Sequence, residues 1–153
     1  MEDIEKIDCC FLVTSSSKKS YQKLSETYSA IEPPTWALLL AQSTRAAGFN
    51  VKIIDANAEN LTLDEILKRI LIMSPRLICF VVYGQNVNAG TSNMSGATFV
   101  SDYLKQNKIN IPISFIGSHV QALPKETLIK EKNIDFVFTN EGVYSLRNIL
   151  KLN

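Results

Sequence analysis

Five short apolar runs recur along the chain, separated by longer segments in which apolar and polar residues mix. The runs read CCFLVT, VKIID, LICFVVYG, ISFIG and DFVFT. The third run is apolar without alternation and partly β-branched, as expected of a central parallel strand that is covered on both faces. The pattern therefore predicts five strands, with the third near the middle of a sheet.

Helix signals fill the intervals between these runs. Pro34 is a favourable first-turn residue and Gly48 a stop, so a first helix is expected between them. Thr62 and Glu65 form a capping-box pattern at the start of a second helix, which Pro75 closes. The apolar faces of these two helices are expected to be Trp36, Leu39, Leu40 and Ala47, and Leu63, Ile66, Leu67, Ile70 and Leu71.

Helical patterns also follow the last three runs, over 99–104, from 124 and from 142. Alternating strands and helices imply a parallel sheet with right-handed crossovers. Residues 1–153 are therefore predicted to form a single α/β domain, a flavodoxin-like doubly wound five-stranded parallel sheet of order 2-1-3-4-5 in a three-layer αβα arrangement. In that order, ligands bind beyond the carboxyl ends of the strands, at the switch point between the first and third.

Two expected connections are longer than the roughly 2–6 residues usual between strand and helix. One runs from Ser15 to Pro33 after the first strand, and the other from Gly84 to Ser95 after the third. Both flank the predicted switch point, so we expect a binding site between them. Tolerated insertions are the alternative reading, because lengthening a loop costs little closure entropy.

The residues expected at this edge are small, hydroxyl-bearing or amide-bearing, and they suit a large, polar, neutral ligand better than an acid–base reaction. After the third, fourth and fifth strands they are Gln85, Asn86, Asn88, Gly90, Thr91, Ser92 and Asn93; Gly117, Ser118 and His119; and Asn140, Glu141 and Gly142.

Composition and missing motifs exclude several functions. The 16 basic residues balance 15 acidic ones, so a basic nucleic-acid surface is not expected. No apolar stretch reaches the roughly 18–20 residues of a membrane span, and the acidic start MEDIEKID lacks a secretory signal. Three cysteines in apolar runs predict buried thiols in a reducing cytoplasm. No dinucleotide glycine motif, P-loop or metal-ligand spacing is present in the sequence.

A flavin-binding or electron-transfer domain stays open as an alternative. The hydroxyls of Thr14, Ser15, Ser16 and Ser17 are suited to surrounding a phosphate. An isoalloxazine ring would need an aromatic partner, for which Tyr83, Tyr28 and Tyr21 are the candidates. A degenerate domain that serves only as a docking surface is a third reading.

Three stretches resemble, in order and spacing, the cobalamin-binding N-terminal domain of cobalamin-dependent radical S-adenosylmethionine enzymes. They are EPPTWALLLAQSTRAAGFNVKIIDAN, FIGSHVQALPKETL and DFVFTNEGVYSL. Ile116 and Ser118 replace a glycine and the proline of that family's Gly-Gly-Pro-His segment. Asn140 and Val143 replace the first glycine and last glutamate of its Gly-Glu-Gly-Glu turn.

The resemblance implies that the chain binds cobalamin, with the lower face of the corrin over the end of the third strand and the nucleotide tail beside the first and third strands. The cofactor-binding residues that it implies are Ser15, Ser16, Tyr83, Gly84, Gln85, Asn86, Asn88, Thr91, Ser92, Gly117, Ser118, His119, Val120, Asn140, Glu141 and Gly142. The iron–sulfur cluster and S-adenosylmethionine would belong to a following C-terminal radical domain, because the C-x-x-x-C-x-x-C motif is not in this sequence. The chain alone is then expected to be non-catalytic, as a module of a methyltransferase-type enzyme.

His119 is the only histidine of the chain. It follows the fourth strand, whereas the cobalt-ligating histidine of the methionine-synthase type follows the first. We expect His119 either to line the groove for the nucleotide tail or brace the loop by hydrogen bonds, or to be a structural loop histidine without ligand contact. We do not expect it to ligate the cobalt.

Overall fold

The computed structural model describes residues 6–14, 33–84 and 87–152, and the backbone alone over 87–89. Its five strands form one parallel sheet in the order β2-β1-β3-β4-β5. They are β1 Cys9–Val13, β2 Val51–Asp55, β3 Leu77–Val82, β4 Ile113–Gly117 and β5 Phe136–Phe138. The predicted doubly wound, flavodoxin-like fold is confirmed.

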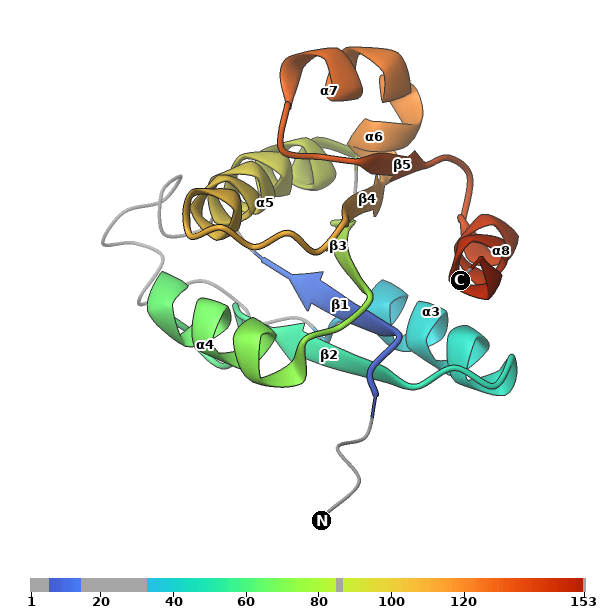
Figure 1. Cartoon of the computed structure of the whole chain (residues 1–153). Helices are drawn as coiled ribbons and strands as arrows, with labels where there is room; N and C mark the ends of the chain where they lie inside the picture. Colours follow the sequence, from blue (N-terminus) through green and yellow to red (C-terminus); the bar gives the residue numbers. More distant parts are fainter. Residues whose placement is uncertain (1–5, 15–32, 85–86, 153) are drawn as a thin grey trace.

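Helices cover both faces of the sheet (Figure 1). On one face lie α3 (Thr35–Ala46) and α8 (Val143–Lys151), and on the other α4 (Leu63–Met73) and α5 (Val87–Gln106). Two short helices, α6 (Ser118–Ala122) and α7 (Pro124–Lys130), pack near the β4–β5 edge. In the part of the chain that the structure describes, no helix has the length and apolar character needed to cross a bilayer. The cytoplasmic location stays a prediction.

The strands alternate their side chains between two apolar clusters, one under each helical layer. Phe80 and Phe115 lie on the α4–α5 face with ring centroids 4.8 Å apart. Phe11 and Ile116 lie on the α3–α8 face. All six residues of β3 are buried, as predicted from its continuous apolar run. Burial of each large side chain contributes about 1.5–3 kcal/mol, so this central strand is a major source of stability.

The start of α4 has the capping box that the sequence predicts. The Thr62 hydroxyl accepts a hydrogen bond from the Glu65 amide at 3.3 Å, and the Glu65 carboxylate accepts one from the Thr62 amide at 2.8 Å. Ile66 and Ile70 are buried, whereas Leu71 at the end of the expected stripe is 59% exposed. The helix ends at Ser74 in a left-handed conformation.

Two local predictions about helices were wrong. In α3 the buried side chains are Ala37, Leu40, Ala41 and Thr44, so the expected face is rotated, with Trp36 and Leu39 exposed. Helix α6 occupies a stretch expected to be loop.

The largest correction concerns the long connection from Gly84 to Ser95. Helix α5 begins at Val87 and runs through most of it. The small and amide residues there are weak helix formers, but the helix gains stability by burying a stripe of small and apolar residues against the sheet and α6. The stripe consists of Gly90, Met94, Ala97, Ser101 and Leu104. The other long connection, after β1, lies almost entirely outside the described residues.

Replacing the cap of α4 should lower stability with little effect elsewhere. We expect Thr62→Ala to lower the free energy of unfolding by about 1 kcal/mol, because the Glu65 amide loses its hydrogen-bond acceptor. Urea denaturation followed by circular dichroism measures the change. Ser95→Ala, in the interior of α5, is the control that removes a hydroxyl from an exposed side chain without removing a cap. Equal midpoints for the two variants would contradict the role assigned to the cap.

The three cysteines are buried free thiols, as predicted. Burial raises the pKa of Cys10 and of Cys79 to about 12 and also raises the pKa of Cys9. The thiols are therefore protonated near neutral pH. Burial of the protonated thiols contributes to the free energy of unfolding at every pH below the ordinary thiol pKa. This contribution is lost as the pH rises from the ordinary pKa toward the raised pKa of the folded protein.

We therefore expect Ellman's reagent at pH 8 to detect no fast-reacting thiol in the folded protein and all three after unfolding in guanidinium chloride, since the thiolate is the nucleophile. A thiol that reacts rapidly in the folded protein would refute the buried environment.

Candidate functional site at the carboxyl edge of the sheet

The carboxyl ends of the strands bring polar residues together along one edge. Thr14 follows β1, Tyr83 and Gly84 follow β3, Ser118 follows β4, and Asn140 follows β5. Because β1, β3 and β4 are parallel and in register, their ends meet at the switch point between β1 and β3. The edge is therefore the candidate site.

On the α3–α8 side, an aromatic pair covers this edge. The rings of Trp36 and Tyr83 stack with centroids 4.5 Å apart and planes inclined by 20°. The Tyr83 hydroxyl donates to the carbonyl oxygen of Asn140 at 3.5 Å, which links the ends of β3 and β5. Burial, and secondarily the negative charge of Glu141, raise the pKa of the Tyr83 phenol. Tyr83 is therefore a neutral hydrogen-bonding group at physiological pH.

On the other side, α5 is tied to the ends of two strands. The Asn93 side-chain amide donates to the Tyr83 carbonyl oxygen at 3.1 Å. The Thr91 hydroxyl and His119 Nδ1 form a hydrogen bond of 3.3 Å between α5 and α6. The Asn93 bond and the aromatic pair therefore hold Tyr83 from both faces of the sheet, and the Thr91–His119 bond joins α5 to α6.

The backbone at the end of β4 passes unusually close to its neighbours. A Cβ atom on Gly117 would lie 2.1 Å from the Val82 carbonyl oxygen, and one on Gly90 would lie 2.2 Å from Ser118 Oγ. Glycine is thus required at position 117, where β4 lies against the β3 backbone, whereas a side chain at position 90 would displace the Ser118 hydroxyl. Within the described residues, Ser118 Oγ is one of two buried side-chain polar atoms without a hydrogen-bond partner, and the other is Arg147 Nε.

Two predicted site residues lie in the protein interior. Val120 is fully buried in the α4–α5 cluster and has no surface for a ligand. Gly142 is buried at the start of α8 with φ of +63°, and a Cβ there would lie 2.5 Å from Ile116 Cδ1. Both residues therefore lie beneath the edge, and their role in cofactor binding stays a prediction.

The other predicted residues are distributed unevenly. Ser15, Ser16, Gln85 and Asn86 lie outside the described residues, and Asn88 is placed by its backbone in α5. Thr91 and Ser92 are exposed on α5 rather than in a loop. Asn140 and Glu141 are exposed in the turn before α8. The structure therefore joins four of the predicted residues in two hydrogen-bonded pairs, Tyr83 with Asn140 and Thr91 with His119. Their role in cofactor binding stays a prediction.

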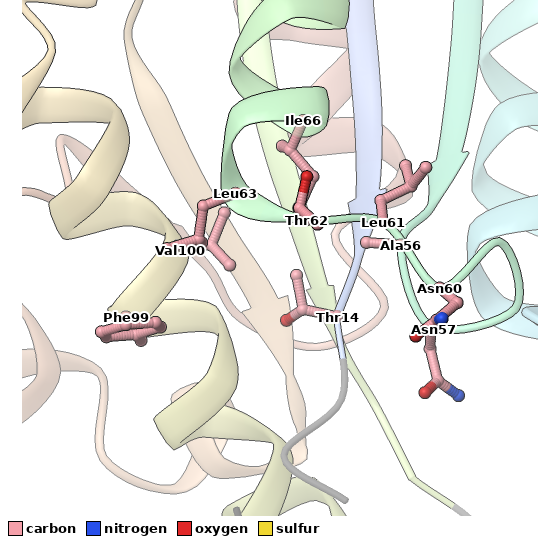
Figure 2. A pocket seen from close by; sticks show the side chains of 10 residues that line it. All are labelled: Thr14, Ala56, Asn57, Asn60, Leu61, Thr62, Leu63, Ile66, Phe99 and Val100. Carbon is pink, nitrogen blue, oxygen red and sulfur yellow. The ribbon is translucent and has the colours of Figure 1, made fainter. Parts of the chain in front are cut away.

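Sequence reasoning missed the role of Trp36, which it assigned to the core, and a pocket beside the edge. The pocket has a volume of about 280 Å³ and lies at the ends of β1 and β2, where Thr14 points into it (Figure 2). The missed signal was the turn NAENLT before α4, whose side chains contribute to its lining.

The chemistry of the edge is that of neutral hydrogen-bonding groups. Among the described residues, no group of three or more histidine, cysteine, aspartate or glutamate side chains is placed to hold a metal ion. Hydroxyls, amides and backbone groups predominate. Such an edge recognises a neutral polar ligand more readily than it activates a nucleophile.

Comparisons with known proteins identify relatives of this chain. The model of the B12 binding domain family matches residues 22–150. A curated protein of Pyrococcus horikoshii, described as an uncharacterised methyltransferase, is 30% identical over 118 residues, which are 77% of this chain and 24% of that protein.

A solved structure, the apo cobalamin-dependent S-adenosylmethionine radical enzyme OxsB, superposes with a TM-score of 0.54 at 15% identity. The match covers 97% of this chain and 19% of the OxsB chain, and at this identity it supports the fold alone. The chain thus spans about a quarter or less of each of these two longer proteins.

The stacked pair at the edge predicts a spectroscopic change. We expect Tyr83→Leu to weaken the near-ultraviolet circular dichroism of Trp36, the single tryptophan, and to cost about 1 kcal/mol of stability. Tyr144→Leu is the control, because Tyr144 is 78% exposed on α8. A Tyr83→Leu spectrum that superposes on that of the wild type would show that the rings are not stacked in solution.

Proposed function

Since the chain belongs to the B12-binding domain family, we propose that it holds a cobalamin across the carboxyl edge of its sheet, as a module of a larger radical S-adenosylmethionine enzyme of the methyltransferase type. The observation that carries the proposal is that neutral hydrogen-bonding groups meet at the switch point of the sheet. The chain in which they meet matches the model of this family over residues 22–150.

The residues at the edge fit the cofactor. The corrin periphery carries neutral carboxamides, which pair with hydroxyls, amides and backbone groups rather than with charged side chains. Ser118 Oγ, buried without a partner among the described residues, supplies an unused donor and acceptor. Tyr83, Thr91 and Asn140 would supply further hydrogen bonds from the ends of β3 and β5 and from α5. When bound, cobalamin supplies a cobalt centre that accepts and passes on a methyl group.

The two substitutions from the family pattern after β4 are accommodated by the fold. Ile116 is fully buried on the α3–α8 face, in the same cluster as Phe138 and close above Gly142. Its bulk is therefore taken up by the core. Ser118 replaces a proline at the first position of α6 and adds a hydroxyl next to the edge. Neither substitution removes a hydrogen-bonding group.

The wider enzyme is inferred from the relatives. The Pyrococcus horikoshii protein is described as a methyltransferase, and OxsB as a cobalamin-dependent S-adenosylmethionine radical enzyme. Both are several times longer than the part that matches. We propose that a C-terminal radical domain carries the iron–sulfur cluster and S-adenosylmethionine, and that this module positions the corrin for it.

In this proposal His119 is a positioning residue and not a cobalt ligand. Its Nδ1 atom is hydrogen-bonded to the Thr91 hydroxyl, and it lies in α6 beyond β4. A histidine held in this way braces the contact between α5 and α6 beside the site. The cobalt would then have no histidine on its lower face.

Ligand retention tests the proposal directly. The protein is incubated with hydroxocobalamin or, in parallel, with flavin mononucleotide, then desalted and examined by visible spectroscopy. We expect about one corrinoid to be retained per chain and no flavin. Retention of flavin without corrinoid would instead favour the electron-transfer alternative, for which the stacked Trp36 and Tyr83 rings are a suitable platform.

Electron paramagnetic resonance tests the proposed lower face. In the cob(II)alamin complex we expect no hyperfine splitting from a nitrogen ligand, and an unchanged spectrum for His119→Ala, because His119 follows β4 and not β1. Nitrogen splitting that disappears in His119→Ala would identify His119 as a ligand. Thr91→Val, which removes the hydroxyl partner and keeps the imidazole, is the matched control.

A further inference from the structure

The outer surface of the layer formed by α3 and α8 carries large apolar side chains that are exposed. Trp36 is 41% exposed, Leu39 is 58% exposed and Tyr144 is 78% exposed. The two helices pack together on one face of the sheet, so these side chains belong to one layer (Figure 1). Apolar groups that gather on one surface and border on polar residues mark an interaction site, whereas scattered single ones do not.

An arginine joins the two helices of this layer. The Nη2 atom of Arg147 on α8 donates to the Ser43 carbonyl oxygen of α3 at 2.7 Å and to the Ser43 hydroxyl at 2.6 Å. The guanidinium carbon of Arg147 lies 5.9 Å from the centroid of the Tyr144 ring. Tyr144, Arg147 and Lys151 follow one another at helical spacing and form one row on α8. The row begins with an aromatic ring and ends with two cations.

The charged side chains of the two helices are all basic. Helix α3 contains Arg45, helix α8 contains Arg147 and Lys151, and neither helix contains an acidic residue. The helix dipole favours basic residues in the last turn, but it favours acidic residues in the first turn equally, and both first turns lack them. Glu141 lies before α8, at the opposite end of the row from Lys151. Helices α4 and α5 on the other face carry both signs, with Asp64, Glu65, Lys68, Arg69, Asp102 and Lys105.

This arrangement favours a protein partner over a lipid surface. Segments that bind anionic lipids carry clusters of about 4–8 lysine or arginine residues, whereas these helices carry only Arg45, Arg147 and Lys151. Arg45 donates to the Val51 carbonyl oxygen at 3.1 Å, and Arg147 is held by Ser43. A guanidinium that is held in place suits a carboxylate of defined position better than a mobile lipid headgroup.

We propose that the outer surface of α3 and α8 docks an acidic, amphipathic helix of a partner polypeptide. The apolar side chains of that helix pack on Trp36, Leu39 and Tyr144, and its carboxylates pair with Arg147 and Lys151. Tyr144 and Lys151 are seven residues apart on α8, a distance of about 10 Å along the helix axis. The carboxylates of the partner therefore lie about two turns from its apolar residues. The proposal does not rest on the proposed function, because docking on this surface needs no cofactor.

Three probes test the chemistry of the occupant in the absence of cobalamin. The first is a peptide of about 18 residues, long enough to be helical, with leucine on one face and glutamate on the other. The second peptide has lysine in place of every glutamate, and the third probe is a vesicle of phosphatidylcholine and phosphatidylglycerol. Amide chemical shifts locate the bound peptide and give its affinity, co-sedimentation measures vesicle binding, and analytical ultracentrifugation measures self-association.

Two variants and two matched controls test the surface. Leu39→Ser removes an exposed apolar side chain from α3, and Ile129→Ser removes one from α7. Lys151→Glu reverses the charge of the last residue of α8, and Lys130→Glu does so for the last residue of α7. All four side chains are exposed, so we expect circular dichroism to show that each variant folds as the wild type does.

We expect the acidic peptide to shift amides of α3 and α8 and to bind more weakly as salt is added. Leu39→Ser and Lys151→Glu are each expected to weaken this binding by about fivefold or more, and their controls to leave it unchanged. The proposal is overturned if the acidic peptide does not bind, if it shifts amides elsewhere, or if the variants bind it as well as their controls do. Equal affinity for the basic peptide, binding to the vesicles, or self-association through these two helices would likewise refute an acidic helix as the occupant.

Discussion

Parallel pairing of β1, β3 and β4 is the constraint on which the site depends. These strands share one direction and one register, so the residues that follow them emerge side by side. The central strand β3 is buried on both faces. Two apolar clusters beneath the edge, rather than contacts at the surface of the edge, therefore hold it in place. Changes at the edge can therefore alter ligand recognition while the sheet beneath keeps its geometry.

Tyr83 connects the two halves of this edge. Its ring stacks on Trp36, its hydroxyl donates to Asn140, and its carbonyl oxygen accepts from Asn93. One residue thus joins α3, the β5 turn and α5. Because these groups are neutral, the edge is suited to holding a large uncharged cofactor, and reactive chemistry then belongs to that cofactor and to a companion domain. Positioning is the contribution that we propose for this chain.

The sequence was sufficient for the sheet and for the start of α4. Continuous apolar runs such as the one ending at Val82 identify buried parallel strands, and the Thr62–Glu65 pair marks a helix start with local chemistry alone. The start of α5 was not predictable in this way, because Gly90 and its small neighbours favour a helix only when they pack against Ser118 and the sheet. The pocket at Thr14 likewise arises from three elements distant in sequence, and no local pattern encodes their spacing.

Ile116 and Gly142 compete for a single volume beneath the edge. A methyl group at Gly142 would meet the end of the Ile116 side chain at 2.5 Å, so the size tolerated at one position depends on the occupant of the other. The two sites are therefore energetically coupled, and their substitutions will not be additive. During divergence, a shorter side chain at position 116 would relieve only part of the cost of enlarging the turn before α8, because a Cβ at position 142 would also lie 2.9 Å from Phe138 Cβ in a left-handed backbone conformation.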